Sequence, residues 1–150
     1  MEQFTTNTPE ETLLLGENLG KKLNQGDIVL LFGDLGSGKT LLTQGITRGL
    51  GLEKNEYIRS PSFTLVNEYK ARYPIHHIDL YRIESFLAIE NLGLEEILFG
   101  SGVTIIEWAE KLYKIPGDDS TLVLPIHKRL EIHITIKEDD TRLIAVIPKP

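Results

Sequence analysis

The segment GDLGSGKT, residues 33–40, lies between a continuous apolar run and a stretch with helical periodicity. The upstream residues 27–32, DIVLLF, are typical of a buried strand in a parallel sheet. The downstream stretch carries apolar residues at the spacing of one helix face: Leu41, Leu42, Ile46 and Leu50. A strand that turns through glycines directly into a helix restricts the chain to an α/β fold.

The same segment matches the pattern G-x-x-x-x-G-K-[ST], in which backbone N–H groups surround phosphates. In this pattern the lysine reaches the β- and γ-phosphates and the hydroxyl meets Mg²⁺, so we expect Lys39 and Thr40 to be catalytic. The N-terminus of the following helix adds partial positive charge at the loop. The expected nucleotide contacts span the loop and position 41: Gly33, Asp34, Leu35, Gly36, Ser37, Gly38, Lys39 and Thr40.

Two carboxylates follow apolar runs elsewhere in the chain. Glu107 comes directly after VTII, and Asp79 after the more polar run IHHI. P-loop enzymes place an acidic residue at the end of a strand near the phosphate loop, where it helps to hold Mg²⁺. We expect both residues to be catalytic, one holding Mg²⁺ directly or through water and the other orienting the attacking water. The sequence leaves the division of these two roles open.

The flanking segments predict the remaining elements. Thr8 as N-cap, Pro9 at the first position and Glu11 indicate a helix to about Leu23. Its apolar stripe should pack on a sheet: Leu13, Leu14, Leu15, Leu19 and Leu23. Residues 62–69, 73–83, 102–108 and 120–125 favour strands. Residues 85–99 favour a helix broken at Gly93, and residues 129–148 favour a terminal hairpin around KEDD. The pattern predicts a three-layer P-loop NTPase fold, with a mixed, mostly parallel sheet flanked by helices and a C-terminal antiparallel hairpin.

Length and composition set limits on this interpretation. We expect the 150 residues to form a single domain, and the absence of cysteine excludes disulfides, thiol catalysis and cysteine-bound metal. The acidic start of the chain lacks the pattern of a secretory signal, and no apolar run is long enough for a membrane span, so a cytoplasmic location is expected. With a formal net charge of −6, the chain should bind nucleic acid weakly by itself.

The sequence favours ATP over GTP, because no N-K-x-D segment for reading guanine follows Thr40. Three functional classes remain: an ATPase, a small P-loop kinase that phosphorylates a small-molecule acceptor, and a regulatory module that responds to its nucleotide. An arginine-rich lid would favour the kinase, but no arginine cluster follows residue 82. A kinase would require an acceptor for turnover, whereas a regulatory module would require a partner.

Four motifs occur in the order GDLGSGKT, SPSFTLVNEY, HHIDLYR and IIEW. In this order and at these separations, they resemble the TsaE family, bacterial ATPases required for threonylcarbamoyladenosine modification of tRNA. The resemblance extends over nearly the whole chain. It implies that Lys39 and Thr40 bind phosphate and Mg²⁺, and that Asp79, Glu107 and Trp108 complete the ATPase site.

The resemblance also implies a switch-like loop and a set of partners. The loop would consist of Ser60, Pro61, Ser62, Phe63 and Thr64. Ser62 stands where the family often has threonine and keeps the hydroxyl. A protein of this family would bind the TsaB–TsaD pair, which transfers the threonylcarbamoyl group, and would hydrolyse ATP weakly alone and faster in the complex. Contact with tRNA would be only indirect.

Overall fold

The computed structural model describes residues 1–34, 36–56, 58, 61 and 65–150. Leu35 and four of the expected switch-loop residues, Ser60, Ser62, Phe63 and Thr64, lie outside the described part. The expectations for their roles therefore stay predictions.

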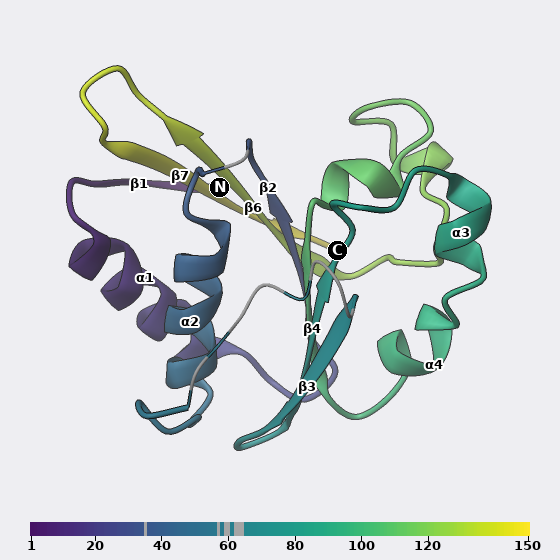
Figure 1. Cartoon of the computed structure of the whole chain (residues 1–150), viewed down its shortest axis with the longest axis horizontal. Coiled ribbons are helices and arrows are strands. Elements are labelled where there is room, and N and C mark those ends of the chain that lie inside the picture. The colour runs from purple at the N-terminus through teal and green to yellow at the C-terminus, as the bar shows by residue number, and fades with distance from the viewer. Residues whose placement is uncertain (35, 57, 59–60, 62–64) are drawn as a thin grey trace.

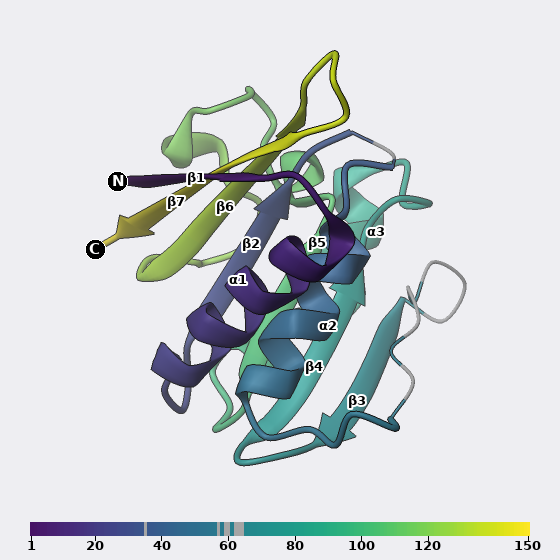
Figure 2. The same ribbon diagram turned by 90° about the vertical axis from the view of Figure 1, so that its left-hand side faces the viewer.

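A seven-stranded sheet forms the middle layer of the fold, in the order β1-β7-β6-β2-β5-β4-β3. Its strands are β1 (Glu2–Thr6), β2 (Ile28–Phe32), β3 (Val66–Lys70), β4 (Pro74–Asp79), β5 (Val103–Glu107), β6 (Arg129–Ile136) and β7 (Arg142–Lys149). Strands β4, β5, β2 and β6 are parallel neighbours, whereas β3, β7 and β1 pair antiparallel. The predicted mixed sheet with a terminal hairpin is confirmed. The two chain ends lie side by side, because β1 pairs with β7 (Figure 2).

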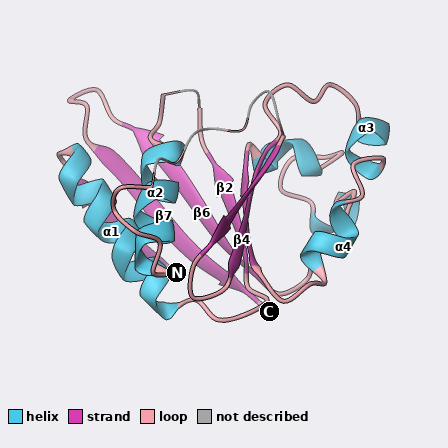
Figure 3. Ribbon diagram, turned by 60° about the horizontal axis from the view of Figure 1, so that its bottom comes forward, coloured by secondary structure: helices cyan, strands magenta, loops and turns pink. Residues whose placement is uncertain are grey.

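Helices cover both faces of this sheet (Figures 1 and 3). One face carries α1 (Pro9–Lys22) and α2 (Lys39–Gly49). The other carries α3 (Phe86–Glu90), α4 (Leu94–Leu98) and a 3₁₀ turn, η1 (Ala109–Leu112). Strands β2 and β5 are buried along their whole length, which explains their continuous apolar sequences. The three predicted layers are confirmed.

The first helix begins as predicted, with one change in its cap. The Thr8 side chain accepts a hydrogen bond from the Glu11 N–H at 3.1 Å. The Glu11 carboxylate, however, accepts from the N–H of Asn7 at 2.7 Å rather than from that of Thr8. The predicted stripe is also corrected at one position, because Leu14 points away from the sheet and is 57% exposed.

Glycines fill the contact between α1 and α2. Gly16 and Gly20 of α1 face Gly45 and Gly49 of α2, with three residues between the members of each pair. A Cβ atom on Gly20 would lie 2.1 Å from the Ile46 carbonyl oxygen, and one on Gly49 would lie 2.2 Å from that of Glu17. The two helix backbones therefore touch, which side chains larger than hydrogen would prevent.

Two predictions from alternation need correction. Residues 120–125 do not form a strand: η2 (Asp119–Thr121) is followed only by an isolated bridge between Tyr113 and Leu122. Conversely, β1 was not predicted, because this edge strand is mostly exposed and lacks an apolar run. Both errors arise because strand pairing depends on neighbours distant in the sequence.

Replacing Gly20 with alanine should destabilise the fold by about 1–3 kcal/mol, the usual cost of overpacking a close contact. Helix propensity alone predicts that Gly20→Ala stabilises the fold, since alanine is the better helix former. Chemical denaturation of Gly20→Ala and the wild type measures the difference in their free energies of unfolding.

Asn18→Ala is the matched control, because Asn18 lies on the exposed side of α1. It should leave stability unchanged or slightly raised. Equal stability of Gly20→Ala and the wild type would contradict the backbone contact.

Candidate functional site

The phosphate-loop motif occupies the turn between β2 and α2. Gly36 and Gly38 adopt φ angles of 78° and 104°, which residues with a side chain rarely take. Gly38 is the N-cap of α2, so the first free N–H groups of this helix point toward the loop. The Arg142 guanidinium, at the start of β7, donates a hydrogen bond to the Ser37 carbonyl oxygen at 3.0 Å and ties the loop to the hairpin.

The predicted residues gather around one pocket of about 380 Å³. Its lining includes Gly36, Ser37, Gly38, Lys39, Thr40, Leu41, Asp79, Tyr81, Arg82, Glu107 and Trp108. Asp79 and Glu107 end the adjacent parallel strands β4 and β5, where they are register partners. The pocket thus lies at the carboxyl ends of the parallel strands, as the fold predicts. Gly33 and Asp34 lie outside this lining and face another cavity.

Glu107 forms the centre of the polar contacts in this pocket. The Thr40 hydroxyl donates to the Glu107 carboxylate, with distances of 3.1 Å to Oε1 and 3.4 Å to Oε2. The Nε2 atom of His77 contacts Oε2 of the same carboxylate. Glu107 is therefore buried and has hydrogen-bonding partners. Asp79 is also buried and accepts a hydrogen bond from the Tyr81 N–H at 2.8 Å.

Lys39 folds back onto its own loop. Its ammonium donates to the carbonyl oxygens of Gly33 and of Asp34, the latter at 3.0 Å, and lies 3.9 Å from the centre of the Trp108 ring. Burial lowers the pKa of Lys39 below its ordinary value, although nearby carboxylates, Glu110 foremost, act to raise it. A phosphate would therefore meet a lysine that already has partners.

Trp108 holds an uncommon backbone conformation. Its φ of 59° is left-handed, which costs a residue with a bulky side chain about 1–3 kcal/mol. The conformation lets the chain leave β5 and enter η1 while the indole packs on Tyr81, with ring centres 5.0 Å apart. Trp108 thus covers Lys39 on one side and contacts a pocket residue on the other.

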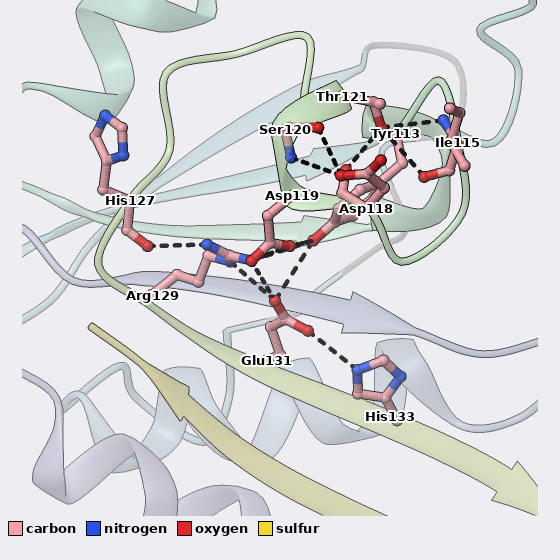
Figure 4. A network of polar contacts seen from close by, with 10 residues as sticks. All are labelled: Tyr113, Ile115, Asp118, Asp119, Ser120, Thr121, His127, Arg129, Glu131 and His133. Carbon is pink, nitrogen blue, oxygen red and sulfur yellow. Dashed lines mark hydrogen bonds and ion pairs between the residues drawn. The ribbon is translucent and has the colours of Figure 1, made fainter.

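A larger cavity, of about 710 Å³, lies behind the phosphate loop. A buried polar network forms part of its wall (Figure 4). Arg129 donates to Glu131 at 2.9 Å and to Asp119 at 2.9 Å, and it also contacts the Tyr113 hydroxyl. Burial alone would lower the pKa of Arg129, but its hydrogen bonds with Asp119 and Glu131 raise it. This network anchors the chain after η1 to β6.

We call the smaller pocket the phosphate pocket, because Lys39, Thr40 and Glu107, for which the sequence predicts phosphate or Mg²⁺ contacts, line it and do not line the larger cavity. Ser37 lines both the smaller pocket and the larger cavity. In the wall of the larger cavity, the Glu110 carboxylate accepts the Gly33 N–H at 3.0 Å.

Sequence reasoning did not assign His77 and Glu110 to this site. The sequence alone indicates only that either His76 or His77 faces the core or the edge of the site; the structure buries His77 beside Glu107. Its spacing of two residues from Asp79 was the available signal, because alternate residues of a strand share a face. Glu110 lies in a turn, and no periodicity marks it. Pro61 of the expected switch loop is buried and is absent from the lining of the phosphate pocket.

This chain is similar to known proteins in both sequence and fold. Residues 6–144 match the family described as threonylcarbamoyl adenosine biosynthesis protein TsaE. Two relatives carry the name tRNA threonylcarbamoyladenosine biosynthesis protein TsaE. The one from Nostoc sp. (strain PCC 7120) is 46% identical, over 93% of this chain and 81% of the relative. The one from Bacillus subtilis (strain 168) is 37% identical, over 95% of this chain and 83% of the relative.

The crystal structure of YdiB from Bacillus subtilis superposes with a TM-score of 0.77 and 32% sequence identity, covering 99% of this chain and 84% of that one. The match therefore includes the sheet, both helical layers and the phosphate loop. The family match spans the same elements, from the end of β1 into β7. This chain belongs to the TsaE family.

Proposed function

We propose that this protein is a Mg²⁺-dependent ATPase that supports threonylcarbamoyladenosine modification of tRNA by binding the TsaB–TsaD pair. One observation carries the proposal: the Thr40 hydroxyl donates to Glu107 inside the pocket that Lys39 and Asp79 also line. A phosphate-binding loop, a hydroxyl and two strand-end carboxylates are the groups that phosphoryl transfer to water requires.

The residues present fit a Mg²⁺ ion bound together with a nucleotide. Mg²⁺ keeps several waters and takes few protein ligands beside the phosphates, so a hydroxyl and one carboxylate suffice. Among the described residues, no group of three or more histidine and acidic side chains could hold a metal without the nucleotide. We propose that Thr40 and Glu107 hold the ion, which neutralises charge on the phosphate oxygens when bound.

The contacts suggest how the two carboxylates divide their work. Glu107 accepts a hydrogen bond from the Thr40 hydroxyl, so we place it next to the Mg²⁺ ion that Thr40 would bind. Asp79 lies across from Glu107 in the sheet and lines the same pocket. We assign to Asp79 the orientation of the attacking water, a task that needs correct placement more than strong basicity.

The partner proposal rests on the family and on charge. The net charge of −6 disfavours tight binding of tRNA by this chain alone, so contact with tRNA would pass through the complex. None of the helices in the described part of the chain has the length and apolar character needed to span a bilayer. We propose that the chain acts as a single domain in the cytoplasm.

The first test is steady-state ATP hydrolysis by the purified protein, alone and with the TsaB–TsaD pair. Hydrolysis should be weak alone and at least tenfold faster with the pair, because the partner completes the preorganised site. Glu107→Ala should abolish the stimulation. Turnover that appears only with a small-molecule acceptor would instead establish a kinase.

The division between the carboxylates predicts different defects. Glu107→Gln should raise the Mg²⁺ concentration for half-maximal turnover about tenfold, since the charged partner of Thr40 is lost. Asp79→Asn should lower kcat by about 10²-fold, with its Mg²⁺ dependence unchanged. Titration of turnover against Mg²⁺ measures both. Identical Mg²⁺ dependences in the two variants would refute the assignment.

Lys39→Met should weaken ATP binding about 10- to 100-fold, because a charge-assisted hydrogen bond to phosphate contributes about 1.5–3 kcal/mol. The single tryptophan, Trp108, contacts the Lys39 ammonium, so its fluorescence reports binding. Lys70→Met is the control, because Lys70 is exposed at the end of β3 and pairs with Pro74, at the end of β4 away from the pocket. A fluorescence titration of Lys39→Met identical to that of the wild type would contradict phosphate binding by Lys39.

A further inference from the structure

His77 is the most completely buried ionisable residue beside the phosphate pocket. Its side chain is 0% exposed, yet it does not line the pocket. Its Nε2 atom contacts the Oε2 atom of Glu107. Since it lies behind Glu107 rather than toward a ligand, any effect on catalysis must pass through that carboxylate.

The sheet places the two side chains together. His77 lies on β4 and faces Ile105 of β5 in the register, two residues before the pair of Asp79 and Glu107. Because side chains alternate along a strand, His77 and Asp79 share a sheet face. Ile75 and Ile105 pack in the core beneath α1 and α2, which identifies this face as the one that carries α2. Thr40, at the start of α2, meets Glu107 on the same side.

The other ring nitrogen determines what His77 can donate. Nδ1 is buried and has no hydrogen-bond partner within the described part of the chain. A buried N–H without an acceptor costs about 1–3 kcal/mol, whereas an unpaired acceptor nitrogen is tolerated more easily. A proton on Nε2 therefore fits the surroundings, because this N–H can donate to the Glu107 carboxylate.

We propose that His77 is a positioning residue, which holds one oxygen of Glu107 so that the carboxylate stays directed at the Thr40 hydroxyl. This inference rests on the proposed function, in which Glu107 and Thr40 act at the Mg²⁺ ion. A glutamate has several rotatable bonds, and fixing them before the nucleotide binds removes part of the ordering cost from the reaction. Without His77, Glu107 loses both a partner and its fixed direction.

The kinetic test compares His77→Leu with His77→Gln in the presence of the partner pair. Leucine fills the space but donates nothing, whereas the glutamine amide reaches about as far as Nε2 and can donate. His77→Leu should lower kcat about 10- to 100-fold, with ATP binding measured by Trp108 fluorescence changed less than about threefold. His77→Gln should recover most of the lost kcat. A purely structural role would not produce this rescue.

His76→Leu is the matched control, because the neighbouring histidine points to the opposite face and lies 3.8 Å from Glu68. It should leave kcat unchanged. In a Glu107→Gln background, His77→Leu should lower kcat by less than about threefold further, since residues that act through one another are not additive. Full kcat in His77→Leu, no rescue by glutamine, or additive effects would each overturn the proposal.

NMR tests the contact without any turnover. Correlation spectra of the imidazole groups should show a proton on Nε2 of His77, and its resonance should shift in Glu107→Gln. An Nε2 without a proton overturns the proposal, even if His77→Leu fails to fold. If the wild-type protein shows no partner-stimulated hydrolysis, the proposed function fails, while these spectra still decide whether His77 donates to Glu107.

Discussion

The direct contact between the backbones of α1 and α2 determines where the phosphate loop can lie. Gly20 and Gly49 allow the two helices to approach until a single methyl group would clash. With α1 held close, α2 lies over the parallel strands and begins at the carboxyl end of β2. Its first turn then presents Thr40 to Glu107, at the end of β5. The packing of α1 on α2 thus helps to hold the helix whose first turn supplies Thr40 to the pocket.

Several carboxylates in the described part of the chain act on the Lys39 ammonium. Four carboxylates, those of Glu110, Glu107, Asp79 and Asp34, influence its ammonium, and burial opposes all of them. A nucleoside triphosphate would add further negative charge. Phosphate and a divalent cation should therefore bind together more readily than either does alone, because each offsets the cost of bringing in the other.

Much of this site could be predicted from the sequence because its parts lie at the ends of elements. Asp79 and Glu107 follow apolar runs, and parallel strands bring their carboxyl ends to one edge. The glycine contact could not be predicted, because a helix sequence does not show which neighbour will touch it. The strand predicted at residues 120–125 was wrong for a related reason, since an alternating sequence does not show whether a neighbouring strand is available for pairing. The position of His77 could be predicted only in part. Its spacing from Asp79 indicates which sheet face it shares, but its contact with Glu107 depends on the register between β4 and β5.

The resting arrangement of Lys39 limits how much its charge can contribute to binding. Its ammonium already donates to two loop carbonyls and lies over the Trp108 ring. A phosphate bound by Lys39 would have to replace these contacts, so the net gain would be the difference between two satisfied states of the ammonium. The same exchange releases the carbonyls of Gly33 and Asp34 and uncovers the indole. In the proposed function, nucleotide binding would therefore be coupled to the packing of Trp108 through the Lys39 side chain, which the indole contacts from its left-handed turn.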